Sequence, residues 1–410
     1  MARNTSNANQ HLGMRKNYPY IIALIMSVLV LSCTADIATS EAEDSPISDT
    51  GDAVIGIIPE METDDEDVTR STLIFSPTLR AMTFAWEQTD AIGVFPYKYA
   101  GIATTQQRFG ILPTEINGLS AKFKKDNDAV QMLEGGKQYV SYSPFSTVDE
   151  NRNAVHATFR NQIQKESVNM DAYYKRAVSN DMMNAYLESE AKASAHLGKY
   201  DYMVSSATAP VDGKASFHFT RLGSIVRFYL RIPAEGYYDS IQVINKDADF
   251  IIDADLDITK SDAAKAFIKP VTSHIVSLAF RKDVTDESGN VTGQSGFDLY
   301  DSKNNPYYGE PSSGRRGYII AYMMFAPINL KDDKIGQSTL YLLGHDKSGN
   351  KTYYRAKDKL SKINIAQNKT QQWAPAELEN DQPIDFVPVE VEIWKDDTNF
   401  DNNGTGTDDW

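Results

Sequence analysis

The chain has 410 residues, a formal net charge of −15 and a single cysteine, together with 22 tyrosines and 17 phenylalanines. This acidic balance repels phosphate backbones and therefore disfavours binding to nucleic acid. One cysteine excludes an internal disulfide, and the wealth of aromatic residues is typical of β-rich exported domains. The length is sufficient for two sizeable hydrophobic cores.

The N-terminal stretch has the three parts of a secretory signal peptide. Residues 20–31 are apolar apart from one serine, three basic residues precede them, and no acidic residue occurs before position 36. A span across a bilayer takes about 20 apolar residues, so this run is too short for a transmembrane helix. We expect cleavage after Ser32.

The residue that follows this cleavage point is the only cysteine of the chain. Val30–Cys33 resembles the bacterial lipoprotein box, in which the thiol receives a diacylglyceryl group and the new amino terminus is acylated, typically with palmitate. Lipidation explains an unpaired cysteine in an exported protein. The alternative is that Cys33 serves only as a small apolar residue at the end of an ordinary signal peptide. We predict a lipoprotein whose acyl chains at Cys33 tether a water-soluble chain to a membrane.

Residues 34–70 are interpreted as an acidic tether, with twelve acidic residues and one basic residue. Such a segment cannot bury enough apolar surface to fold alone. One apolar run interrupts it: Ala53–Ile58, closed by Pro59, predicts a strand buried on both faces, an exposed apolar patch being the alternative. Arg70, isolated among acidic residues, is accessible to a trypsin-like protease.

From residue 71 onward, short strands recur with turn residues between them, which predicts a mainly β fold of the sandwich or barrel type. Residues 173–197 carry apolar side chains at helical spacing and predict a short helix or ordered loop. The stretch 207–213 is typical of a linker. Ser-Gly-Asn at 288–290 and again at 348–350 predicts two hairpin turns.

The last predicted strand alternates between two faces. Val387, Val389, Val391 and Ile393 share one face, and acidic residues occupy most of the other. Pro388 cannot donate to a strand ladder, so it belongs in an edge strand or at the start of a strand.

Patterns that suggest binding or catalytic chemistry have simpler interpretations. Asp253, Asp255 and Asp257 lack the Gly and Glu of a calcium loop, and we expect them to line the wet face of an edge strand. Residues 344–351 lack the lysine of a phosphate-binding loop, and the histidines show no metal-ligand spacing. We therefore expect neither an enzyme nor a cofactor or metal site.

Four stretches, in this order behind the lipoprotein box, resemble the fimbrillin-like surface lipoproteins of Bacteroides-type bacteria, the Mfa-like family of type V pilins. They are FAWEQTDAIGVFPY at 84–97, QYVSYSPF at 138–145, KYDYMVSSATAP at 199–210 and ASFHFTRLGSIVRFYL at 215–230. The resemblance implies two consecutive β-sandwich domains, which we expect at 71–208 and 209–395, with the helix or ordered loop in the first. Residues 1–33 would be the lipoprotein signal peptide with its acylated cysteine, and residues 396–410 a polar tail.

The resemblance also implies a function, that of a structural and adhesive subunit of a surface pilus. In pilus-building members an Arg-specific protease removes the N-terminal segment, and a strand donated by another subunit fills the groove that this opens. The matching cleavage site is Arg70. The matching removable strand comprises Val54, Ile55, Ile57 and Ile58. The matching donor strand comprises Val387, Val389, Val391 and Ile393, although this strand could equally belong to the protein's own second domain.

The alternative is a monomeric surface lipoprotein that binds glycans or host ligands. The paired tyrosines 237–238 and 307–308 are able to stack on sugars, although one ring of such a pair usually lies in the core and the other at the rim. In either case we expect a lipid anchor in the outer membrane, with the chain exposed at the cell surface or in a fimbrium. The expected partners are other pilus subunits, the membrane and a surface ligand, but no nucleic acid.

Overall fold

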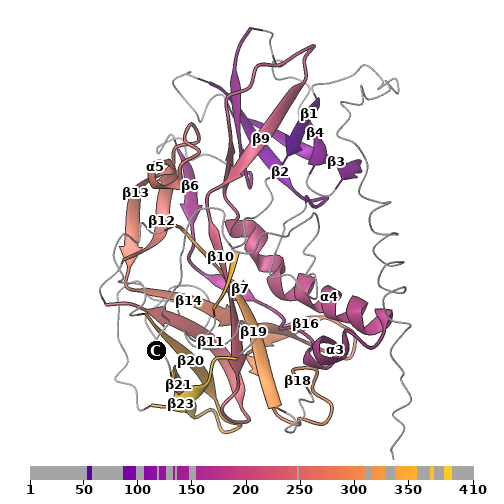
Figure 1. Ribbon diagram of the computed structural model, residues 1–410, viewed down its shortest axis with the longest axis vertical. Coiled ribbons are helices and arrows are strands. Elements are labelled where there is room, and N and C mark those ends of the chain that lie inside the picture. The colour runs from indigo at the N-terminus through magenta and orange to yellow at the C-terminus, as the bar shows by residue number, and fades with distance from the viewer. Residues whose placement is uncertain are drawn as a thin grey trace, which may run out of the picture. The chain divides into compact units, whose positions relative to one another are not determined.

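A computed structural model of the chain is mainly β, as predicted (Figure 1). It describes residues 53–57, 86–97, 106–117, 120–125, 133, 136–146, 154–246, 249–309, 316–327, 338–357, 370–373 and 383–389. Of the predicted lipidation, cleavage, removable-strand and donor-strand residues, Cys33, Ile58, Arg70, Val391 and Ile393 lie outside this described part.

Seven strands form a closed barrel in the order β1-β4-β3-β2-β5-β8-β9. They are β1 (Ala53–Ile57), β2 (Ala91–Pro96), β3 (Gln107–Asn117), β4 (Ser120–Lys125), β5 (Tyr139–Ser143), β8 (Met203–Ser205) and β9 (Ala215–Arg221). The period-two pattern is clearest in β9, where Ala215, Phe217 and Phe219 are buried while Ser216 and His218 are exposed. In β9 this alternation places the apolar side chains on one face and the polar ones on the other, whereas β2, β5 and β8 are buried on both faces.

The second large core lies between a four-stranded and a seven-stranded sheet. The smaller sheet has the order β18 (Tyr308–Gly309), β19 (Arg316–Phe325), β10 (Ser224–Arg231) and β22 (Thr370–Trp373). The larger has the order β23 (Phe386–Pro388), β21 (Lys351–Ala356), β20 (Thr339–His345), β11 (Tyr237–Ile244), β14 (Ile275–Phe280) and β7 (Gln162–Gln164), and β17 (Phe297–Asp298) also pairs with β11. Phe228 and Ile319 of the smaller sheet share one buried cluster with Ile241 and Leu342 of the larger.

The other face of the four-stranded sheet is covered by helices. The predicted helical segment forms α3 (Met170–Lys175), α4 (Asn180–Ser194) and the 3-10 helix η1 (Ala195–Tyr200). Ser179 caps α4 by accepting a hydrogen bond from the Met182 amide. Glu190 of α4 is fully buried against Arg227 of β10, 3.4 Å away, and accepts a hydrogen bond from Tyr322 of β19. Burial raises the pKa of this carboxyl.

Two smaller sheets complete the described fold, β13 (Phe267–Ser273) with β12 (Phe250–Leu256) and β6 (Val155–Thr158), and the hairpin β15 (Lys282–Thr285) with β16 (Val291–Ser295). The expectation that three aspartates line an edge strand is wrong, because β12 is the middle strand of its sheet. Asp253 pairs with Arg160, Asp255 with Lys269 at 3.0 Å, and Asp257 caps the turn that follows. A short helix, α5 (Ala263–Ala266), precedes β13.

Both predicted hairpin turns are confirmed. One joins β15 to β16 and the other joins β20 to β21, with Gly289 at φ 84° and Gly349 at φ 83°. An L-residue rarely adopts this left-handed conformation, which explains the glycine in each turn. Residues 206–214, which include the predicted linker, join β8 to β9 of the barrel. The predicted domain boundary at residue 208 stays a prediction.

Candidate assembly site

Strand β1 is the element that closes the barrel. Its backbone pairs antiparallel with β4, where Ile55 is opposite Lys122, and parallel with β9, where Ile55 is opposite Ser216 (Figure 1). The residues opposite Ile55 lie about 70 residues further along the chain in β4 and about 160 residues further in β9. The segment predicted as the removable strand is therefore a strand, and it lies between two others.

The barrel wall on either side of β1 is strongly apolar on its inner face. Ala121 and Phe123 of β4, and Ala215 and Phe217 of β9, are buried in one cluster. Trp86 packs edge-on against Phe123, with the ring centroids 4.9 Å apart. Without β1, this cluster would lose one part of its wall, and the facing backbone groups of β4 and β9 would lose their hydrogen-bond partners.

A buried ion pair lies at the end of β9. The Arg221 side chain is fully buried, and its Nε and Nη2 donate to the two carboxylate oxygens of Asp201 at 2.5 and 2.8 Å. A two-pronged pair of this kind fixes the geometry of both side chains. Breaking a buried pair leaves one uncompensated charge in an apolar surrounding, which is strongly destabilising.

Asp90, just before β2, lies near the same ion pair. Burial raises the pKa of its carboxyl to about 6, and the negative charges of Glu87 and Asp201 act in the same direction. The carboxylate accepts a hydrogen bond from the Glu87 amide at 2.8 Å, which opposes the increase. Sequence reasoning did not single out Asp90, Asp201 or Arg221. A charged residue at an inward-facing position of an apolar strand, as Arg221 is in β9, is the signal that could have found the pair.

The predicted donor strand is only partly described, and its first residues pair within the same chain. Phe386–Pro388 form β23, the edge strand next to β21, with Val387 opposite Arg355. The Val389 amide donates to the Tyr353 carbonyl at 3.1 Å. The position of Pro388 in an edge strand agrees with its missing donor.

The described residues contain no group of three or more His, Cys, Asp or Glu side chains that could hold a metal ion. Within the same part of the chain, no helix is long and apolar enough to cross a membrane. Of the paired tyrosines, Tyr238 is buried and Tyr237 half-buried as expected, whereas Tyr307 and Tyr308 are both buried.

The chain is similar to solved structures of cell adhesion and fimbrial proteins from Bacteroides. A candidate cell adhesion protein from Bacteroides ovatus matches with a TM-score of 0.40 and 11% identity, over 84% of this chain and 98% of that one. A second, from Bacteroides uniformis, matches with a TM-score of 0.38 and 12% identity, over 74% and 93%. A fimbrial protein from Bacteroides ovatus matches with a TM-score of 0.28 and 12% identity, over 80% and 49%. No family model and no curated protein matches the chain.

Proposed function

We propose that the protein is an adhesive subunit of a bacterial surface pilus, anchored first as a lipoprotein through Cys33 and assembled by strand exchange after cleavage at Arg70. The observation that supports this best is the position of β1. It precedes the proposed cleavage site in sequence and lies between β4 and β9, both of which follow that site.

Cleavage at Arg70 would change how β1 is held. In the intact chain the strand is covalently joined to β2, so it rebinds at a high effective concentration whenever it detaches. After cleavage, the same strand is a separate peptide held by its backbone hydrogen bonds and its apolar contacts alone. The fraction of barrels that keep this peptide then depends on the peptide's concentration in solution, and a barrel that has lost it can bind another strand.

The groove left by β1 has the properties that strand addition requires. It would present unpaired backbone groups on β4 and β9, together with the apolar cluster around Phe123 and Phe217. An incoming strand gains main-chain hydrogen bonds and buries apolar side chains, each worth about 1.5–3 kcal/mol. If the strand of Val387 and Val389 is the donor, it must first leave β21, to which it is joined by a short ladder.

The test is controlled cleavage of the purified chain without its signal peptide. An Arg-specific protease should yield a product that begins at Ser71, and this product should form polymers that size-exclusion chromatography and electron microscopy detect. Arg70→Lys resists this protease and should stay monomeric, but trypsin should cut it and restore polymer formation. Arg70→Lys with the two proteases therefore separates the effect of cleavage from the effect of the side chain at position 70.

Two results would count against the proposal. One is polymer formation by uncut Arg70→Lys at the rate of the cleaved protein. The other is a product that begins at Ser71, has lost β1 and remains monomeric at high concentration. The second result would favour a monomeric surface adhesin.

A further inference from the structure

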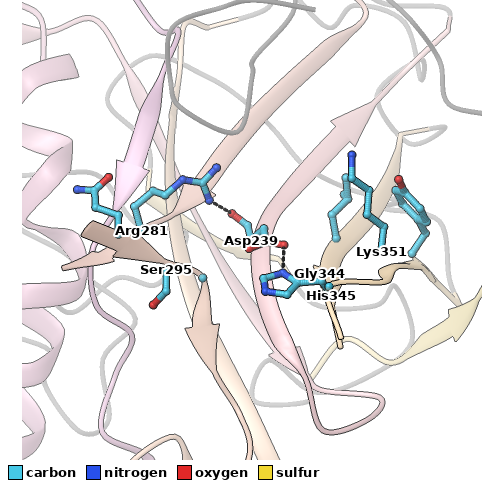
Figure 2. A pocket seen from close by; sticks show the side chains of 11 residues that line it. Asp239, Arg281, Ser295, Gly344, His345 and Lys351 are labelled. Carbon is cyan, nitrogen blue, oxygen red and sulfur yellow. Dashed lines mark hydrogen bonds and ion pairs between the residues drawn. The ribbon is translucent and has the colours of Figure 1, made fainter. Parts of the chain in front are cut away.

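A pocket of about 400 Å³ opens between two hairpins, β15–β16 and β20–β21 (Figure 2). Its charged and titratable lining residues are Asp239 of β11, Arg281 just after β14, His345 at the end of β20 and Lys351 at the start of β21. The volume falls within the range of about 300–1,000 Å³ that is usual for small-molecule sites.

The two hairpins that form the walls are stiffened by the same turn. Each turn has the sequence Asp-x-Ser-Gly-Asn, at 286–290 and at 346–350. In both, the aspartate accepts hydrogen bonds from the serine and asparagine amides and from the asparagine side chain. Each turn is therefore held by bonds within its own five residues.

The floor of the pocket is built around a β-bulge at Asp239. Pairing between β11 and β20 shifts by one residue between Tyr238 and Ser240, so that Asp239 is the extra residue. Bulges re-aim side chains and occur frequently beside functional sites. A Cβ at Gly296 would lie 2.5 Å from the Asp239 carboxylate, and one at Gly344 would clash with the Tyr237 carbonyl. Glycine is required at both positions for the strands to approach this closely.

The polar groups in the pocket are held in fixed orientations. The Asp239 carboxylate is 2.8 Å from Nδ1 of His345, and the imidazole stacks on Tyr237 with 5.0 Å between ring centroids. Arg281 is only 7% exposed, and its Nη1 donates to the carbonyl oxygens of Asp239 and Phe280 at 3.1 and 2.9 Å. Figure 2 shows Arg281 and Lys351 on opposite sides of the Asp239–His345 pair.

The charge of the lining is opposite to that of the protein. Arg281 and Lys351 supply two positive charges against the single carboxylate of Asp239, whereas the whole chain has a net charge of −15. A concave site with an excess of one sign attracts ligands of the other sign. The remaining polar lining, which includes the Ser295 hydroxyl and the imidazole, is suited to hydroxyl groups, and the half-buried Tyr353 ring offers a face to aliphatic C–H groups.

We propose that this pocket binds a sugar acid, a monosaccharide unit that carries a carboxylate. The carboxylate lies between Arg281 and Lys351, and the ring hydroxyls bond to the Asp239–His345 pair and Ser295. Such a site would let the protein recognise acidic glycans at a surface. It is independent of cleavage at Arg70 and lies on strands outside the barrel.

The test compares two sugars that differ in one group. Methyl β-glucuronide has a carboxylate where methyl β-glucoside has a hydroxymethyl group. Titrated into the full chain without its signal peptide and followed by NMR, the glucuronide should bind about tenfold more tightly, as expected for a charge-assisted hydrogen bond. Lys351→Gln should remove most of this preference, and Gly296→Ala should weaken the binding of both sugars.

The control is Lys347→Gln, an exposed lysine of the same turn that does not line the pocket and lies over the Tyr300 ring. It should bind both sugars as the wild type does, and thermal melting should show that both lysine variants are folded. The proposal is wrong if the two sugars bind equally, if neither binds, or if Lys347→Gln weakens glucuronide binding as much as Lys351→Gln does.

Discussion

Two strands from distant parts of the sequence run parallel to consecutive strands, but they have different surroundings. β1 is parallel to β9, and β22 is parallel to β10, which begins three residues after β9 ends. β1 has a second neighbour, β4, and so closes a barrel, whereas β22 ends its sheet. Loss of β1 would open a ring and create two new edges, while loss of β22 would uncover one edge. A removable strand has its greatest effect in a closed barrel.

The largest expected effects come from the apolar cores beside these two strands. Phe217 of β9 and Phe228 of β10 are both fully buried, so replacing either with alanine should lower the free energy of unfolding by about 3–5 kcal/mol in the intact chain. After cleavage and release of β1, Phe217→Ala should become less costly than Phe228→Ala, because β9, the strand of Phe217, loses its backbone pairing with β1 and becomes an edge strand. Urea denaturation of cut and uncut proteins measures both differences, and equal costs after release would show that β1 does not support this core.

Proline substitution tests the backbone hydrogen bonds of β1 and β22. Successive amides of a strand point to opposite sides, so proline at Val54, Ile55 or Gly56 removes a hydrogen bond to either β4 or β9. We expect each of the three variants to lose about 1–3 kcal/mol of stability. In β22, which has one neighbour among the described strands, only one of Gln371→Pro and Gln372→Pro should have this effect. A small effect of Ile55→Pro alone would indicate that β1 is not held from both sides.

The smallest expected effect concerns pH and the end of the barrel. Because the pKa of Asp90 is raised to about 6 from its ordinary value of 3.8, its contribution to stability is fully present below about pH 4 and is lost as the pH rises through 6. Asp90→Asn should therefore leave stability unchanged near pH 4 and raise it by about 1–2 kcal/mol at pH 7, after allowance for screening by solvent.

The matched control for this titration is Glu188→Gln on α4. A hydrogen bond from Lys192 lowers the pKa of Glu188, so its contribution is present above the ordinary pKa and is lost as the pH falls. The two variants should change stability in opposite directions at neutral pH. Urea denaturation at several pH values gives the curves, and a gain for Asp90→Asn that does not depend on pH would contradict the assigned titration.

Several local elements of this protein, namely a strand, two hairpin turns and a helical segment, could be predicted from short stretches of sequence. The apolar run at 53–58 predicted a strand, and β1 forms over Ala53–Ile57. The Ser-Gly-Asn triplets predicted both hairpin turns, and helical spacing predicted the segment that contains α4. Each of these depends on neighbours within a few residues, since side-chain periodicity and turn chemistry act over that range.

Which elements pair with one another is seen only in the tertiary structure. Alternation along a strand shows which side chains share a face, but it does not identify the strand on either side, so neither the closure of β1 by β4 and β9 nor the central position of β12 could be predicted. The Asp201–Arg221 pair and the pocket at Asp239 have the same origin. The pair joins β9 to the residue that follows η1. The pocket depends on a one-residue shift between β11 and β20, where Arg281 bonds to the backbone carbonyl of Asp239 and His345 to its carboxylate.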